Sequence, residues 1–274
     1  MTHMTPCIEI DHLTKSYGDK VAVRDLSLTV RSGEVFCFLG PNGAGKTTTI
    51  HTIVGHKNPT AGDVRINGVH VGSPEIHEVR RAVGYMAEQP VLYDYLTGRE
   101  FLLFIAELYG VDASRRDWID EQLERLELGG DADTLIKTYS LGMKKKIAFL
   151  AALVPDPNIL LFDEPTGSLD AASARLVKDY MLDARDAGKL VFFTTHIMEI
   201  AERLADRLAV IHHGRLIAEG TLDDLRQQFG RTPSESLEDI FLRITGGDAR
   251  RASGNPIESA APVGGKGTSW PDSR

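Results

Sequence analysis

Cysteine is scarce in this sequence: two residues, Cys7 and Cys37, occur among 274. So few cysteines exclude a disulfide-stabilised scaffold and favour a reducing compartment. Both lie in short apolar runs that are typical of strands. We therefore interpret them as small hydrophobic core residues rather than as reactive groups.

Long hydrophobic segments are also lacking. The longest unbroken apolar run, residues 147–154, has eight residues, whereas a helix that spans a bilayer needs about 20. The first 15 residues contain no basic stretch followed by an apolar one, so we expect no secretory signal. Any role at a membrane is therefore expected to need a second protein that crosses it.

Positive charge is in deficit, because 31 Lys and Arg residues face 39 Asp and Glu residues, which gives a formal net charge of −8. A protein that binds nucleic acid generally needs a basic face that displaces counterions from the phosphates. We therefore expect no nucleic-acid partner and a cytoplasmic location.

Strand-like and helix-like segments alternate along the chain. The continuously apolar run at residues 35–40 indicates a strand buried on both faces. Strands are expected at residues 8–13, 21–30, 35–40, 63–67, 159–162, 190–194 and 208–211, and helices at residues 46–54, 99–109 and 115–128. This alternation predicts an α/β fold with a mostly parallel sheet whose faces are covered by helices.

A glycine-rich segment follows the expected buried strand and matches the pattern G-x-x-x-x-G-K-[ST] completely. Backbone N–H groups in such a loop, and the positive end of the helix after it, converge on phosphate oxygens. Lys46 is expected to reach the β- and γ-phosphates of a nucleotide, and the Thr47 hydroxyl to ligate Mg²⁺. The candidate nucleotide-binding residues of this segment are Gly40, Pro41, Asn42, Gly43, Ala44, Gly45, Lys46, Thr47 and Thr48.

An acidic pair ends the apolar strand in the segment NILLFDE at residues 158–164. Asp163 is expected to hold Mg²⁺ through water, and Glu164 to orient or deprotonate the attacking water. Acids also favour helix N-termini, so the pair alone is a weak indication. Together with the glycine-rich segment, however, it predicts nucleotide hydrolysis.

Further motifs lie in one register with these two: TGSLD up to Asp170, YSLGM around Ser140, the strand VFFTT before His196, and TKSYG around Tyr17. In order and spacing, from about residue 8 to residue 220, the sequence resembles the ATP-binding subunits of ABC transporters. The resemblance implies a P-loop NTPase core with a mostly parallel sheet, an N-terminal antiparallel β-subdomain and an inserted α-helical subdomain.

One ATPase domain is expected over residues 1–245, with the helical subdomain at about residues 90–152 and a closing segment at about residues 221–245. Residues 246–274 are rich in Gly, Ser, Ala and Pro. They contain too few apolar residues to offset the entropy of ordering them, so we expect a disordered tail.

The resemblance assigns a role to each further motif, and an ordinary structural role remains open beside some of them. Tyr17 would stack on adenine through its flat ring, or be a half-buried tyrosine at a strand end. His196 would hydrogen-bond the γ-phosphate, or be a buried structural histidine. Asp170 would lie at a dimer seam, or cap a helix.

The signature segment of the family corresponds here to Ser140, Leu141, Gly142 and Met143, with Leu141 and Met143 replacing the usual glycine and glutamine. Ser140 and Gly142 would begin a helix whose N-terminus points at the ATP of a partner subunit, where the hydroxyl, the free amides and the helix dipole favour an anion.

The Q-loop of the family is the second departure. Its glutamine aligns with Glu88, which Gln89 follows. Either Glu88 approaches Mg²⁺ as a carboxylate, or Gln89 takes over after a one-residue shift; we favour Glu88. Both departures, and the segment SLEDIFLRIT at residues 236–245, resemble the ABC-2 type exporter branch, in which the permease is a separate polypeptide.

The resemblance therefore implies an ATPase that drives a transporter with the cofactors ATP and Mg²⁺. Two copies would sandwich two ATP molecules, because one chain has one glycine-rich loop and one signature segment. A separate multispanning permease would hold the dimer at the inner face of the membrane. The expected catalytic residues are Glu164, His196 and Lys46, and the expected metal ligands are Thr47, Asp163 and Glu88.

A soluble ABC-type ATPase that acts on chromosomes or ribosomes is the alternative. The chromosome branch inserts long coiled coils between the glycine-rich loop and the signature segment, whereas residues 48–138 contain no sustained heptads. The ribosome branch usually has two ATPase cores in one chain, and a single core is evident here. The transporter subunit is therefore the favoured interpretation.

Overall fold

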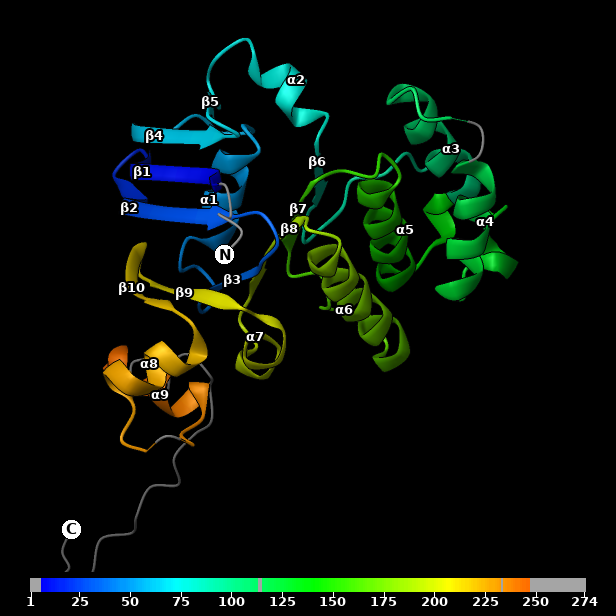
Figure 1. Ribbon diagram of the computed structural model, residues 1–274. Coiled ribbons are helices and arrows are strands. Elements are labelled where there is room, and N and C mark those ends of the chain that lie inside the picture. Colours follow the sequence, from blue (N-terminus) through cyan, green and yellow to red (C-terminus); the bar gives the residue numbers. More distant parts are fainter. Residues whose placement is uncertain (1–5, 113–114, 233, 247–274) are drawn as a thin grey trace, which may run out of the picture.

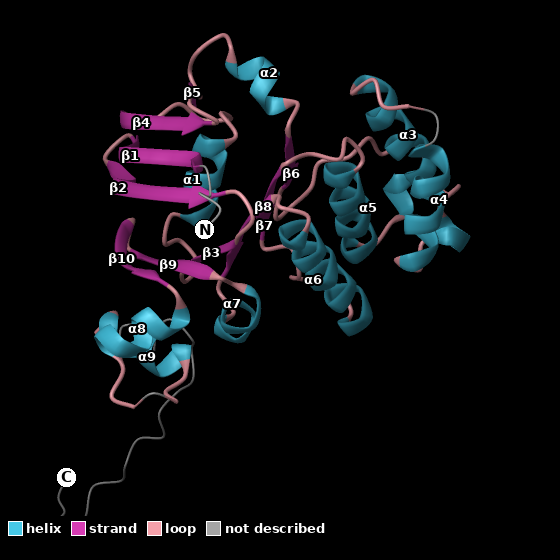
Figure 2. Cartoon of the chain, viewed as in Figure 1, coloured by secondary structure: helices cyan, strands magenta, loops and turns pink. Residues whose placement is uncertain are grey.

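The computed structural model describes residues 6–112, 115–232 and 234–246. Residues 247–274, which make up nearly all of the expected disordered tail, lie outside this described part. Two sheets and the helices around them form the described structure (Figures 1 and 2).

The larger sheet has six strands in the order β10-β9-β3-β8-β7-β6. All neighbours are parallel except β10, which is antiparallel to β9. Its strands are β3 (Val35–Leu39), β6 (Val83–Met86), β7 (Ile159–Asp163), β8 (Leu190–Thr195), β9 (Arg207–His212) and β10 (Arg215–Gly220). The expected mostly parallel sheet is confirmed.

The smaller sheet is antiparallel and has the order β2-β1-β4-β5. Its strands are β1 (Pro6–Tyr17), β2 (Lys20–Arg31), β4 (Ala61–Ile66) and β5 (Val69–His70). It lies beside α1 at the upper left of Figure 1 and confirms the antiparallel N-terminal part of the fold.

Most helices lie around the two sheets, and three of them form a separate group on one side. Figure 2 shows α3, α4 and α5 together on the side away from the antiparallel sheet, and α8 and α9 beside β9 and β10. The helices are α1 (Lys46–Ile53), α2 (Ile76–Arg80), α3 (Gly98–Leu108), α4 (Arg115–Arg125), α5 (Leu141–Leu153), α6 (Ala171–Asp186), α7 (Met198–Leu204), α8 (Leu222–Phe229) and α9 (Leu237–Ile244), with short 3₁₀ helices η1 (Gly129–Asp131) and η2 (Ile136–Thr138).

Strand β3 is buried on both faces because its side chains alternate between two hydrophobic clusters. Cys37 belongs to the cluster on the side of α5, and Phe36 and Phe38 belong to the one that includes α1. Phe192 of β8 stacks on Phe36 with ring centroids 5.7 Å apart. Burial raises the pKa of the Cys37 thiol, as expected for a core cysteine.

The sequence prediction differs from the structure at some boundaries. The helix predicted over residues 115–128 ends at Arg125, because Glu127 has a left-handed backbone with φ of 58° that stops it. The strands β5, β6 and β10 were not predicted, because their short sequences contain no clear alternation of apolar and polar residues.

Candidate nucleotide-binding and catalytic site

The glycine-rich segment forms a tight loop between β3 and α1. Gly45 caps α1 with φ of 113°, a left-handed conformation that glycine adopts without strain. A Cβ atom at Gly40 would lie 2.4 Å from the backbone oxygen of Ile211, so β9 leaves no room for a side chain there. The loop therefore presents backbone rather than side chains at the start of α1, as binding of a phosphate group requires.

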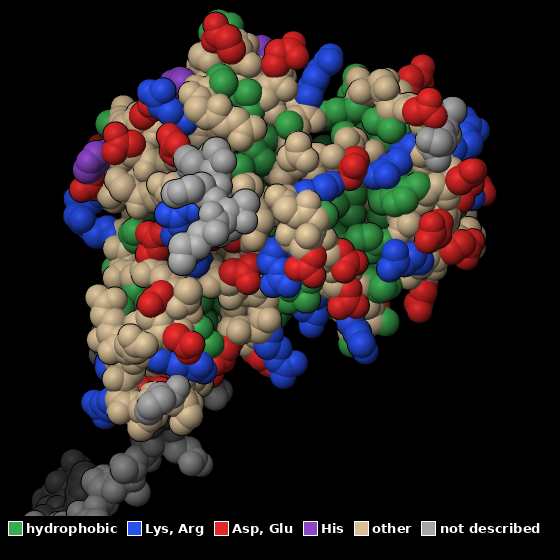
Figure 3. Space-filling view, viewed as in Figure 1, with side chains coloured by type: hydrophobic (Ala, Val, Ile, Leu, Met, Phe, Trp, Pro, Cys, Tyr) green, Lys and Arg blue, Asp and Glu red, His purple; other side chains and the backbone are tan. Residues whose placement is uncertain are grey.

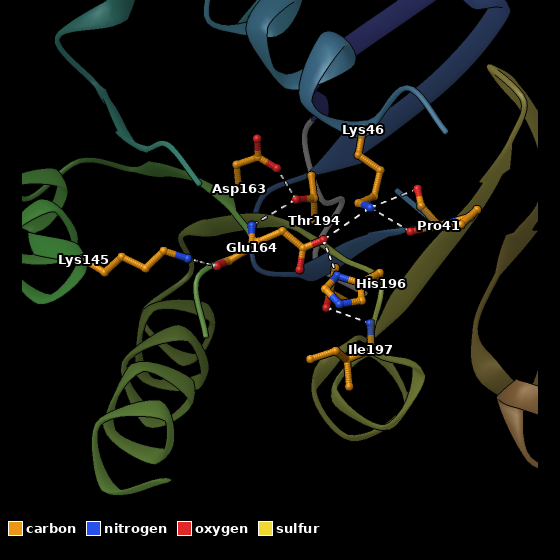
Figure 4. A network of polar contacts seen from close by, with 10 residues as sticks. Pro41, Lys46, Lys145, Asp163, Glu164, Thr194, His196 and Ile197 are labelled. Atoms are coloured by element: carbon orange, nitrogen blue, oxygen red, sulfur yellow. Dashed lines mark hydrogen bonds and ion pairs between the residues drawn. The ribbon is translucent and has the colours of Figure 1, made fainter. Parts of the chain in front are cut away.

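Lys46, the first residue of α1, turns back over this loop. Its Nζ donates hydrogen bonds to the backbone oxygens of Gly40 at 2.7 Å and Pro41 at 3.3 Å. The same Nζ lies 3.3 Å from Oε1 of Glu164, and both side chains are buried. Two segments that are more than a hundred residues apart thus meet as a buried ion pair (Figure 4).

Asp163 and Glu164 lie at the carboxyl end of β7, next to the end of β8. The Thr194 hydroxyl donates to Oδ1 of Asp163 and accepts from the backbone N–H of Glu164 at 3.1 Å. One hydroxyl therefore orients both acidic residues. Thr194 belongs to none of the sequence motifs, although two threonines that end an otherwise apolar strand are a usable signal.

His196 follows β8 and completes the cluster. Its Nδ1 lies 3.0 Å from Oε1 of Glu164, so the same carboxylate oxygen contacts both His196 and Lys46. Figure 4 shows these three side chains converging, while the Asp163 carboxylate points elsewhere. The structure thus brings together the predicted catalytic residues Lys46, Glu164 and His196.

A cavity of about 510 Å³ opens over Lys46 and Glu164, whereas His196 and Asp163 are not among the described residues that line it. Tyr17, at the end of β1, lines it, is 44% exposed and has the Lys15 ammonium 5.2 Å from its ring centroid. The predicted residues that line this cavity are Tyr17, Asn42, Gly43, Gly45, Lys46, Thr47, Thr48, Glu88 and Glu164. Ala44 is buried, and Gly40 and Pro41 contribute the carbonyl groups that hold Lys46.

The two Q-loop candidates face different cavities. Glu88 lines the cavity over the glycine-rich loop. Gln89 lines a second cavity of about 620 Å³ between the end of β6 and the helices α3 and α5. Of the two candidates, Glu88 is therefore the one that shares a cavity with the glycine-rich loop.

The signature segment lies apart from the cluster, at the start of α5. The Ser140 hydroxyl caps α5 by accepting a hydrogen bond from the backbone N–H of Met143 at 3.2 Å. Leu141 is 51% exposed. None of its four residues (Ser140, Leu141, Gly142 and Met143) is among the described residues that line the cavity over the glycine-rich loop. Within one chain the signature segment and the loop do not form one site.

Asp170 caps α6, in agreement with the structural alternative that the sequence left open. Its carboxylate accepts from the backbone N–H of Ser173 at 2.8 Å and from the Ser173 hydroxyl at 2.7 Å. The Lys146 ammonium lies 3.2 Å away. The Ser173 hydrogen bonds, first the backbone and then the hydroxyl, together with Lys146 hold the Asp170 pKa well below its usual range.

Comparison with known proteins identifies the family of this site. Residues 23–167, more than half of the chain, match the family described as ABC transporter. The chain belongs to the ABC transporter family. It is therefore an ATPase of the ABC type, and the glycine-rich loop lies within the matched residues.

Relatives of this ABC ATPase include subunits named for drug resistance and for export. It is 40% identical over 230 residues to the daunorubicin/doxorubicin resistance ATP-binding protein DrrA of Streptomyces peucetius. The aligned region covers 84% of this chain and 69% of that protein. It is 42% identical over 215 residues to the Nod factor export ATP-binding protein I of Paraburkholderia xenovorans (strain LB400), with 78% and 70% covered.

Solved structures of ABC proteins share the fold. An ATP-binding subunit of an ABC transporter superposes with a TM-score of 0.81 at 33% identity, covering 87% of this chain and 99% of that one. A dimeric ATP-binding cassette in a post-hydrolysis state, bound to ADP and Pi, superposes with a TM-score of 0.71 at 27% identity, covering 78% and 98%. The family relationship thus extends to subunits captured with hydrolysis products.

The chemistry of the donor set in this ABC ATPase fits Mg²⁺. Oδ2 of Asp163 is buried and has no hydrogen-bond partner among the described residues, and Thr47 lines the cavity over the glycine-rich loop. The described part of the chain holds no group of three or more His, Cys, Asp or Glu residues that could bind a metal by itself. Few protein ligands, supplemented by water and substrate phosphates, are the usual arrangement for Mg²⁺.

The described part of this ABC ATPase also contains no helix with the length and hydrophobicity that crossing a membrane requires.

Proposed function

We propose that this ABC ATPase is the ATP-hydrolysing subunit of an exporter and that it works as a homodimer on a separate membrane permease. The observation that carries the proposal is the separation, within one chain, of the Lys46–Glu164–His196 cluster from the signature segment at Ser140. Since both are needed around one ATP, a second copy supplies the missing half of each site. Two sites with two ATP molecules result.

Hydrolysis in this proposal uses the residues of the cluster. The backbone N–H groups at the start of α1 and the Lys46 ammonium bind the β- and γ-phosphates, which requires Lys46 to exchange its contacts with the loop carbonyls for phosphate oxygens. Glu164 accepts the proton of the attacking water, and His196 holds the γ-phosphate beside it. Tyr17 stacks on the adenine ring.

Mg²⁺ would be held by Thr47, Asp163 and Glu88 together with phosphate oxygens, and it would neutralise charge that develops on the transferred phosphoryl group. Oδ2 of Asp163, which has no hydrogen-bond partner within the described part of the chain, supports this assignment. Thr194 keeps the other Asp163 oxygen engaged, which leaves Oδ2 for the metal and its waters.

The direction of transport is proposed from the relatives. The names of DrrA and of the Nod factor export proteins refer to resistance and export. The sequence features of the ABC-2 branch, above all Glu88 and the segment at residues 236–245, agree with them. We therefore assign the chain to export, at the inner face of the cell membrane and without a nucleic-acid partner.

The second cavity, beside Gln89, is the proposed contact with the permease. Its lining is mainly apolar and includes residues of β6, α3 and α5, and His51, His56 and Arg80 add polar groups. Val91 and Tyr95, on the loop between β6 and α3, are 97% and 83% exposed. Figure 3 shows hydrophobic side chains gathering toward the part of this face where Figure 1 places α3 and α5. An apolar surface of this kind suits a short permease helix.

Purification of the tagged chain from detergent-solubilised membranes of its own host tests the proposal. A multispanning protein should accompany the wild-type chain and be lost with the double variant Val91→Glu, Tyr95→Glu, which introduces charge on the exposed loop. Ile217→Glu on β10 is the matched control and should retain the partner. Recovery of ribosomes or DNA-associated proteins in place of a membrane protein would contradict the proposal.

A further inference from the structure

Lys145 is a buried cation that the reaction outlined above does not use. It lies in the second turn of α5 and is only 3% exposed. Its Nζ donates a hydrogen bond to the backbone oxygen of Glu164 at 3.2 Å. Figure 4 shows Lys145 reaching Glu164 from the side of α5, while Lys46 contacts the carboxylate of the same residue.

The environment of Lys145 combines burial with three nearby negative charges. Burial lowers the pKa of Lys145, and the negative charges of Glu88, Glu164 and Asp163 act against that shift. Among the described residues none of these three carboxylates forms an ion pair with Lys145, so its directed contact is the one to the Glu164 backbone. A methionine of similar length would fill the space without the cost of burying a charge.

The backbone of Glu164 needs such a contact. Glu164 has φ of 49°, in the left-handed region that is strained for residues other than glycine. Strain of this kind persists only where neighbouring groups hold it. The Glu164 N–H is held by Thr194 at 3.1 Å, and its carbonyl is held by the Gly167 N–H at 3.2 Å and by Lys145.

We propose that Lys145 is a positioning residue for hydrolysis, whose ammonium group holds the Glu164 carbonyl and thereby keeps the Glu164 carboxylate directed at Lys46 and His196. Lys145 also lies on the helix that begins with the signature segment. Displacement of α5 when that segment engages the partner's ATP is therefore transmitted by Lys145 to Glu164 of its own chain. This second step rests on the proposed function, because it requires the dimer.

Steady-state kinetics of Lys145→Met test the positioning role. Because the carboxylate loses its direction while the phosphate loop stays intact, kcat should fall by about 10- to 100-fold, whereas KM and the directly measured affinity for ATP should change by less than about twofold. Lys145→Arg, which keeps a cationic donor, should recover most of kcat. Lys178→Met on α6 is the matched control and should leave kcat unchanged, and thermal unfolding of every variant verifies folding.

A double-mutant cycle with Glu164→Gln separates positioning from general disruption of α5. If Lys145 acts through Glu164, Lys145→Met should cause no further loss in the residual hydrolysis of Glu164→Gln. Losses that multiply in the double variant, or an unchanged kcat in Lys145→Met alone, would overturn the proposal. Failure of the proposed function would give a different result. The wild-type chain would then hydrolyse ATP, but the Glu164→Gln variant would form no ATP-dependent dimer.

Discussion

A single carboxylate oxygen, Oε1 of Glu164, accepts contacts from Lys46 at 3.3 Å and from His196 at 3.0 Å. The chemistry therefore depends on one side chain. Glu164→Gln keeps the size of this side chain and removes its capacity to take a proton. Hydrolysis should fall by about 100-fold or more, whereas ATP binding should persist and an ATP-bound dimer should accumulate.

Phosphate release, nucleotide-binding titration and light scattering with ATP measure these three outcomes. Glu199→Gln serves as the control, because Glu199 pairs only with Arg203 on the surface of α7 in the described structure. Near-normal hydrolysis by Glu164→Gln would remove Glu164 from the role of base.

Thr194 is a second single residue on which the site depends, although it is not among the described residues that line the cavity over the glycine-rich loop. Thr194→Val retains the shape of the side chain and leaves Oδ1 of Asp163 and the N–H of Glu164 without their partner. The free energy of unfolding should fall by about 1–3 kcal/mol, and kcat should fall more than ATP affinity because the acidic pair loses its alignment. Chemical denaturation and steady-state kinetics measure both, and Thr194→Ser should restore both. An unchanged kcat in Thr194→Val would argue against the alignment role.

The stability of helix α6 depends on Asp170, the residue that caps its N-terminus. Asp170→Ala removes the acceptor for Ser173 and should lower the free energy of unfolding by about 1 kcal/mol, whereas Asp170→Asn keeps the cap and should cost less than half as much. The depressed pKa of Asp170 means that this stabilisation is present above the ordinary Asp range and is lost as the pH falls through and below it. Denaturation of the three proteins at pH 7 and at pH 3 measures the effect; equal stability of Ala and Asn variants at pH 7 would contradict it.

The elements that the sequence predicted well are those with a local signal. Strand β3 has a continuous apolar run, and the loop after it has glycines at fixed spacing, so both were predicted nearly to the residue. Strand β6, by contrast, is four residues long and exists because it pairs with β7. The contacts of Lys145 and Thr194 with Glu164 likewise arise from tertiary packing across 19 and 30 positions of the chain. The two threonines that end β8 mark a polar strand end, but no periodicity or motif indicates in advance which residues Thr194 or Lys145 contacts.

The arrangement of the whole molecule separates two half-sites. Figure 1 shows α5, which begins with the signature segment, on the far side of β7 and β8 from α1, which begins with Lys46. A closed point-group dimer supplies each half-site with its complement, since two copies related by a two-fold axis exchange the same surfaces. Activity should therefore depend on which chain of a dimer carries a given defect.

Mixing of two inactive variants tests this dependence. Lys46→Ala removes the phosphate contact and leaves the signature segment intact. Ser140→Asp keeps a good cap for α5, because aspartate accepts the Met143 N–H as serine does, but its charge repels the partner's γ-phosphate. Half of the dimers in an equal mixture are mixed and contain one intact site of two, so hydrolysis should recover to about a quarter of the wild-type rate.

A mixture of Lys46→Ala with Glu164→Gln is the matched control. Both defects affect the same half-site, so each site of a mixed dimer contains one of them and no activity should return. Phosphate release as a function of the mixing ratio distinguishes the two mixtures. Recovery in both, or in neither, would mean that Ser140 does not act on the ATP of a second chain, and the separation of α5 from α1 would then need another functional explanation.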